Sequence, residues 1–358
     1  MKRIKDSILN TTFSSKGIFT LFVIYVVLSS LIIFLDFSSV IKTPLVITSY
    51  ILILGFLISK HFGLVYKENK LTFWLYSIGF SLVTLMLVGL IINYILPILS
   101  IKHPLGALPI LVVFDLILIS LSYNLFRKNI GKEIKFNEGN LEFMSLHTFI
   151  PVVFLVISSI GTTLLNSIGD NRIVLLLAPS ICAYFIYLFV SKKNFNDSVY
   201  ISTIFFSALS LILTFSMRGP NIIGWDINEE FQVFSKTLEN LRWSMDFYKG
   251  LDYNACISIT ILPTIFQVLT GIGPHYIFKF FFQIFFALLP LSVFSISNKY
   301  INKKLSLLAS FLFISQTWFF EQMPALIRQE VAFYIYSLLL IIILNDEISK
   351  KLKYSIVT

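Results

Sequence analysis

The chain has 358 residues, of which 56% are hydrophobic and only 13% are charged, and its formal net charge is +9. Soluble domains contain about 25% charged residues, and disordered chains are poor in apolar residues, so both classes are excluded. The mean hydropathy of +0.84 predicts an all-α fold, a polytopic transmembrane helical bundle in a lipid bilayer. The excess of positive charge is interpreted as a topology signal, and we expect no nucleic-acid partner.

Seven charge-poor runs precede residue 218. Each offers about the 20 residues that a membrane-spanning helix needs, and 71–101 has spare length. The first six form the predicted N-terminal membrane region, 1–196, and the seventh begins a second region, 197–358. The fourth run contains Asp115, which is either a functional acid or an acid paired with a Tyr or Asn of a neighbouring helix. The runs are 18–35, 43–59, 71–101, 104–126, 147–169, 173–191 and 198–217.

A long external loop, 218–275, is predicted after the seventh span. Its apolar part, 255–273, contains Pro263 and is followed by Pro274, and Gly and Pro end helices. We expect this part to form an amphipathic helix that lies on the outer surface without spanning. The alternative is a kinked full span, because membrane helices tolerate Pro. Three further spans are predicted at 276–297, 305–320 and 331–345.

The distribution of Lys and Arg distinguishes these alternatives. If 255–273 does not cross, the chain makes about ten crossings, and 19 basic residues share the side of both termini against 8 on the opposite side. If it crosses, this bias disappears. The positive-inside rule therefore predicts ten spans in the cell (plasma) membrane, with both termini in the cytoplasm. Lys279 lies near an outer helix end, and we expect its side chain to snorkel toward the interface.

Polar residues of the outer side are concentrated in two loops. In the first, the acids Asp226, Glu229 and Glu230 share one helical face if a helix begins at Asp226, and Asp226 is well placed to cap it. Three carboxylates in one turn suit a divalent metal or a general base with a tuned pKa. A solvated N-terminal turn, where acids favour the positive end of the helix, is the alternative. These three acids are the predicted catalytic residues.

The second outer loop follows the ninth span and contains Glu321, Arg328 and Glu330. Arg suits the bidentate recognition of a phosphate, so Arg328 is predicted to bind substrate, together with Trp225 and Arg242 of the first loop. The alternative for Arg328 is an interfacial residue that pairs with an acid or with lipid headgroups.

The order of parts from 198 to 346 resembles the GT-C superfamily of membrane glycosyltransferases. A span leads into a large external loop with an acidic motif, 224–230 (GWDINEE), and an apolar helix with Pro follows. A later external loop supplies further acids. The stretches 224–230, 252–255 (DYNA) and 327–330 (IRQE) are similar also to an archaeal family of multi-pass membrane proteins of unknown function. The matching stretches cover under half of the chain.

The resemblance implies that a sugar is transferred from a polyprenyl-phosphate-linked donor to an acceptor on the outer face. It implies that Asp226 acts as the base or as a metal ligand, and that Glu321 or Glu330 adds a ligand for a divalent metal, Mg²⁺ or Mn²⁺. Arg328 would face the donor phosphate. This chemistry is sensible, because a phosphate leaving group needs positive charge and the acceptor needs a carboxylate to activate it.

GT-C cores usually continue with more spans, whereas this chain stops at Thr358. Three explanations stay open: a truncated gene, a split enzyme whose core a partner chain completes, or a divergent non-enzyme. Two other functions stay open. The protein could be a non-catalytic membrane scaffold or partner subunit whose outer loop only binds a partner. It could also be a transporter of a lipid-linked sugar, in which Asp115 would matter more; transporters favour inverted repeats, and none is evident between 1–170 and 171–345.

Overall fold

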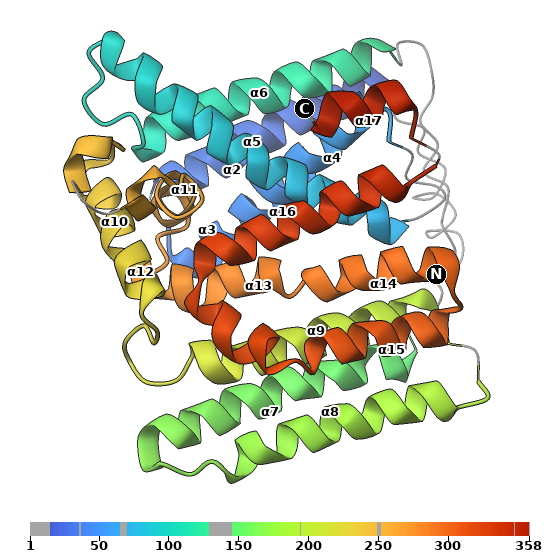
Figure 1. Cartoon of the computed structure of the whole chain (residues 1–358). Coiled ribbons are helices and arrows are strands. Elements are labelled where there is room, and N and C mark those ends of the chain that lie inside the picture. Colours follow the sequence, from blue (N-terminus) through green and yellow to red (C-terminus); the bar gives the residue numbers. More distant parts are fainter. Residues whose placement is uncertain are drawn as a thin grey trace, which may run out of the picture.

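The computed structural model describes residues 15–35, 37–64, 70–128, 145–193, 195–248, 252–346 and 348–357 (Figure 1). The structure is 82% helical, with no strand among these residues, which confirms the predicted all-α bundle. Nine helices of the described ranges are long and apolar enough to cross a membrane. The protein is therefore a multi-pass membrane protein. The basic residues of 1–14 and 129–144 that entered the charge comparison, and Lys67 and Lys249, lie outside the described residues.

The first six spans follow the predicted runs closely. Each is an apolar helix whose backbone hydrogen bonds are made within the segment, as a hydrocarbon environment requires. The second is divided by a π-helical stretch, η1, that follows Pro44. The elements are α2 (Ser15–Phe34), α3 (Ser39–Val46), η1 (Ile47–Ile53), α4 (Leu54–His61), α5 (Lys70–Ile98), α6 (Ala107–Lys128), α7 (Leu146–Ile168) and α8 (Arg172–Val190).

The second half contains two further long spans besides α9, and the shorter elements of the external loops. One span, the run Pro274–Tyr300, is made of four consecutive helical segments. The elements are α9 (Asp197–Ser216), α10 (Asp226–Asn240), η2 (Met245–Tyr248), η3 (Asp252–Ala255), α11 (Ile261–Thr270), α12 (Pro274–Tyr276), η4 (Ile277–Phe281), α13 (Phe282–Phe286), α14 (Leu289–Tyr300), α15 (Lys303–Ile314), η5 (Trp318–Gln322), η6 (Met323–Ala325), α16 (Ile327–Leu344) and α17 (Lys350–Val357).

The connections lie at two opposite ends of the bundle (Figure 1). At one end, here named the loop end, α10 and α12 lie together, and the Leu105 amide donates to the Leu241 carbonyl at 2.9 Å. At the other, the terminal end, Lys303 pairs with Asp197 at 2.5 Å. The start of α2 lies at the terminal end, where Phe19 stacks on Phe126 near the end of α6 at 5.2 Å. Because α17 lies at this end too (Figure 1), the described chain begins and ends on one side.

The predicted span 305–320 is the one that is not found among the helices long enough to cross a membrane. Helix α15 has 12 residues and is interrupted before η5 and η6. At the interruption, the hydroxyl of Ser315 and the amide of Gln316 both donate to the Leu312 carbonyl at 2.9 Å, so side chains compete for the backbone acceptor that would continue the helix. The chain nevertheless returns through α15 from the terminal end to the loop end (Figure 1).

The predicted non-spanning helix is present as α11, which is shorter than the expected 255–273. Its axis points along the view in Figure 1, across the direction of the spans. It differs from the expected surface position, since eight of its ten residues are buried. Helix α5 makes room for it at Gly89, where a Cβ would lie 2.6 Å from the Cγ2 atom of Ile261. The apolar face of α11 thus packs against other helices of the protein.

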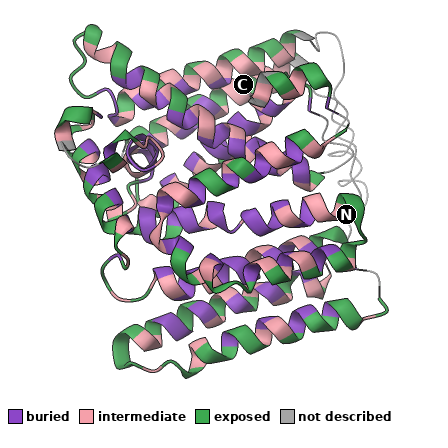
Figure 2. Ribbon diagram, in the orientation of Figure 1, coloured by how far each residue is buried: buried purple, intermediate pink, exposed green. Residues whose placement is uncertain are grey.

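The span from Pro274 to Tyr300 lies at the centre of the bundle, whereas α7 and α8 expose one face at its edge (Figure 2). Lys279 of this central span does not snorkel as expected. Its ammonium is buried and donates to the carbonyls of Gly219 at 2.6 Å and Asn221 at 2.9 Å. It therefore fixes the start of the long external loop against the bundle.

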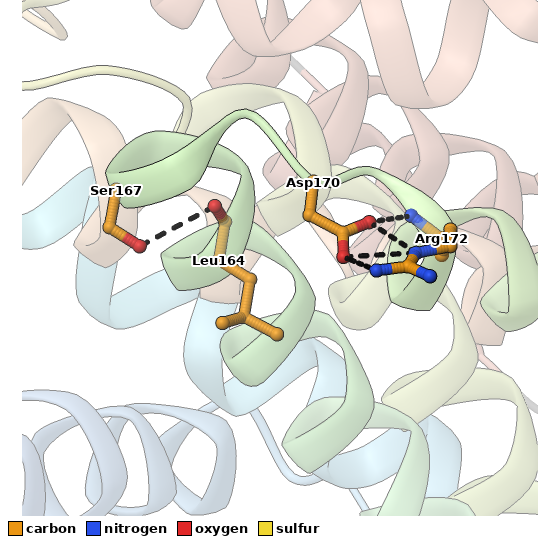
Figure 3. Close-up of polar contacts among 4 residues, drawn as sticks. All are labelled: Leu164, Ser167, Asp170 and Arg172. Carbon is orange, nitrogen blue, oxygen red and sulfur yellow. Dashed lines mark hydrogen bonds and ion pairs between the residues drawn. The ribbon is translucent and has the colours of Figure 1, made fainter.

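Two of the remaining charged residues have local structural partners. Asp115 accepts a hydrogen bond from Tyr50 at 2.8 Å, which supports the structural alternative for this acid. In the turn between α7 and α8, Asp170 accepts from the backbone amide of Arg172 and from its guanidinium, the shortest contact being 2.6 Å (Figure 3). These hydrogen bonds from Arg172 lower the pKa of Asp170 to about 2.

Candidate functional site

Helix α10 begins at Asp226, as the spacing of the acids predicts. Asp226 and Glu230 lie one turn apart on the same face. Asp226 does not cap the helix, however, because the N-cap position is occupied by Trp225 and has no side-chain capping bond. The carboxylate of Asp226 is thereby left to interact with another part of the chain.

The two external loops touch at Gly224, immediately before α10. Its φ angle is +133°, and a Cβ at this position would lie 2.6 Å from the Cβ of Ala325 in the second loop. Only glycine combines this backbone conformation with so close an approach. The side chain of Asn228 also donates to the Gly224 carbonyl, so the turn is fixed from within α10.

Arg328, at the start of α16, lies where these loops meet. Its Nη2 atom is 3.0 Å from Asp226 Oδ2, and its Nη1 atom is 3.7 Å from Glu230 Oε1. The guanidinium carbon lies 4.1 Å from the ring centroid of Tyr253, within the range of a cation–π contact. Three segments that are distant in sequence, α10, η3 and α16, therefore converge on one guanidinium.

Glu230 is the buried acid of the first loop. Its side chain is 0% exposed, and its Oε2 atom accepts the backbone N–H of Ile327 at 2.9 Å. Burial raises the pKa of Glu230 to about 7, and the charge of Arg328 and two backbone N–H groups oppose this rise. The carboxyl therefore titrates near neutral pH, while it holds the start of α16 in place.

Glu330 is an acid of the second loop, 1% exposed and located two residues after Arg328. Neither of its carboxylate oxygens has a hydrogen-bond partner among the described residues, and neither does Oε1 of Gln283. Gln283 and Glu230 are both close enough to Glu330 to interact with its carboxyl group. A buried acid without partners is costly and is a functional candidate in a membrane protein.

The other predicted site residues are at the periphery. The side chain of Trp225 is 92% exposed, and Glu229, Arg242 and Glu321 are exposed as well. Within the described ranges, no group of three or more His, Cys, Asp or Glu side chains is arranged to hold a metal ion. The predicted metal ligands Asp226, Glu321 and Glu330 are thus not brought together as one set of ligands, and metal binding stays a prediction.

The sequence analysis missed a buried polar clamp that holds the first loop. Asn93 of α5 donates from Nδ2 to the Trp243 carbonyl at 2.9 Å, and its Oδ1 accepts the Trp243 amide at 2.7 Å. The indole of Trp243 donates to the Asn254 carbonyl at 2.9 Å, next to Tyr253. A lone amide inside an apolar run such as 71–101 is the signal that could have revealed Asn93.

The chain matches no protein-family model, no curated protein and no solved structure. The fold and the site therefore define the general class of the protein, and no family is identified. The protein is a multi-pass helical membrane protein in which two loops at one end of the bundle form an acid–arginine site.

Proposed function

We propose that the protein is a membrane glycosyltransferase-like enzyme, which transfers a sugar from a polyprenyl-phosphate-linked donor to an acceptor on the outer face of the cell membrane. The observation that supports this proposal is the pairing of Asp226 with Arg328 across the two loops. A carboxylate can accept the proton of an acceptor group, and a guanidinium can bind a phosphate. Sugar transfer from a lipid phosphate needs both.

The exposure of the side chains supports the proposed roles. Those of Asp226 and Arg328 are 36% and 22% exposed, so substrates can reach them, whereas Glu230 is buried. In the proposed reaction, the acceptor oxygen bonds to the sugar carbon and its proton passes to Asp226. The bond between the sugar and the phosphate oxygen breaks, and its electron pair stays on the phosphate, where Arg328 balances the charge. Glu230 positions Arg328 through the Ile327 backbone.

The distribution of charge supports a proposal for the orientation. We propose that the terminal end faces the cytoplasm, because basic residues are concentrated there, and that the loop end faces outward. The acid–arginine site then lies at the outer interface, where a lipid-linked donor presents its phosphate. No step is assigned to Mg²⁺ or Mn²⁺, because Glu321 lies exposed in η5, apart from the converging acids.

The test is the transfer of labelled sugar from a polyprenyl-phosphate sugar by membranes that contain the full chain, with and without Mg²⁺ or Mn²⁺. Asp226→Asn should reduce transfer by about 10²-fold or more, the size of a lost general base. The matched control is Glu239→Gln, which removes an exposed acid of the same helix that pairs with Lys236; it should leave transfer unchanged.

Normal transfer by inserted Asp226→Asn protein would refute the proposal. A requirement for both metal and Asp226 would make this acid a metal ligand, whereas a requirement for Asp226 alone would make it the base. The absence of transfer by folded, inserted wild-type protein, with and without metal and added partner chains, would favour a scaffold or a transporter.

A further inference from the structure

A second feature lies in the membrane-spanning part, away from the acid–arginine site. It is a groove of about 600 Å³ between α5, α7, α9 and the junction of α13 with α14. This volume is within the about 300–1,000 Å³ of ligand pockets. Most of its lining is apolar, and Lys70, Thr148 and Ser198 line it at the first turns of their helices. The apolar side chains include Trp74, Ile78, Phe205, Phe206 and Leu291.

The groove has the depth of one membrane leaflet. Helices α5, α7 and α9 all begin at the terminal end, and each contributes its first turns. Lys70 and Ile78 are eight positions apart along α5, which corresponds to about 12 Å at a rise of about 1.5 Å per residue. Half of the about 30 Å hydrocarbon core is about 15 Å. The groove therefore leads from the interface at the terminal end toward the middle of the membrane, as the chain of a lipid does.

The interfacial end of the groove has the groups that bind an anion. Thr148 is buried, and its hydroxyl has no hydrogen-bond partner within the described part of the chain. It belongs to the first turn of α7, whose preceding residue Ser145 makes no capping bond, and helix N-termini favour negative charge. Lys70 is exposed at the start of α5 and adds an ammonium at the same end of the groove.

We propose that this groove binds one anionic phospholipid of the leaflet at the terminal end. Its phosphate lies at Lys70 and Thr148, and one acyl chain follows the groove past Trp74 to Leu291. Lys70 gives a preference for an anionic over a zwitterionic headgroup, because basic side chains near a bilayer surface attract anionic lipids. This site is independent of the proposed sugar transfer, which takes place at the opposite end of the bundle.

Trp74 provides the readout, because it lines the groove. The full chain in detergent is titrated with phosphatidylglycerol or phosphatidylcholine carrying brominated acyl chains, which quench nearby tryptophans. The quenching that is lost in Trp74→Phe reports on the groove. We expect phosphatidylglycerol to saturate this component at a lower concentration than phosphatidylcholine. Lys70→Gln should weaken phosphatidylglycerol binding about five-fold, the usual effect of one basic residue near an anionic surface.

The matched control is Lys192→Gln, which removes an exposed lysine of the same end that does not line the groove; it should leave the binding unchanged. Thr148→Val replaces the hydroxyl with a methyl group of similar size and should weaken binding as well. Equal affinity for the two lipids, equal effects of Lys70→Gln and Lys192→Gln, or quenching in Trp74→Phe that is as strong as in the wild type would each overturn the proposal. So would tighter binding of a brominated polyprenyl phosphate than of phosphatidylglycerol.

Discussion

Replacing Glu230 by Gln tests whether one buried carboxyl controls how the stability depends on pH. Burial raises the pKa of Glu230 in the folded protein from 4.5 to about 7, and the unfolded chain keeps the ordinary value. Between these two values the folded protein binds more protons than the unfolded chain. The free energy of unfolding is therefore highest below the ordinary pKa and falls as the pH rises toward the folded value.

The expected size follows from the shift. A difference of about 2.5 pKa units at about 1.4 kcal/mol per unit gives about 3 kcal/mol, which the wild type loses between pH 4.5 and 7. Gln does not ionise, and its amide oxygen can still accept the N–H of Ile327. We therefore expect Glu230→Gln to lose less stability over this interval and to exceed the wild type in stability above pH 7.

The assay is reversible unfolding in mixed micelles, followed by tryptophan fluorescence at a series of pH values. Difference infrared spectroscopy detects the protonated carboxyl of Glu230 directly, as a carbonyl band that the Gln variant lacks. Glu239→Gln, on the exposed side of the same helix, is the control and should parallel the wild type. If the curves of wild type and Glu230→Gln run parallel as well, the buried carboxyl does not have the raised pKa, and the reasoning is refuted.

Three further substitutions test the architecture that supports the site. Gly224→Ala places a Cβ against Ala325 at a positive φ and should destabilise the protein by about 1–3 kcal/mol, measured by thermal unfolding, with loss of sugar transfer. Asn93→Ala leaves the amide and carbonyl of Trp243 buried without partners, at about 1–3 kcal/mol for each group; iodide should then quench the indole more strongly. Lys279→Met removes the ammonium group that donates to the backbone carbonyls after α9. Proteolysis of the long external loop should then be faster, and unchanged cleavage would contradict the proposed role of Lys279.

The spans could be predicted from sequence because a hydrocarbon environment imposes one simple condition. Each crossing needs a long apolar run that satisfies its own backbone, so length and charge locate it, as for 71–101 and helix α5. The segment 255–273 met the same apolar condition, and it was the distribution of basic residues, together with Pro263 and Pro274, that indicated that it does not cross. Its burial as α11 could not be predicted, because an apolar face packs equally well against lipid, against an interface or against α5.

The site was only partly predictable for a related reason. Asp226, Glu230, Arg328 and Glu330 were identified as candidates from their residue types, but Asp226 and Arg328 are 102 positions apart in sequence, and no local pattern encodes their contact. Glu321 and Glu330 flank the same loop and look equivalent in sequence. The interruption after α15 leaves Glu321 exposed, whereas the packing of α16 against the central span buries Glu330.

The geometry also suggests an order for the proposed reaction. Arg328 interacts with Asp226, Glu230 and the ring of Tyr253 at the same time, so it can bind a donor phosphate only by giving up part of these contacts. Of the two acids that contact Arg328, Asp226 would be released first, because it is the more exposed one. Glu230 is held by its hydrogen bond from the Ile327 backbone. Binding of the donor would then free the carboxylate that the acceptor needs. In the proposed reaction, one guanidinium would thereby couple the binding of the donor phosphate to the activity of the base. Arg328→Lys, which keeps the charge but loses the bidentate geometry, should then weaken donor binding and transfer together.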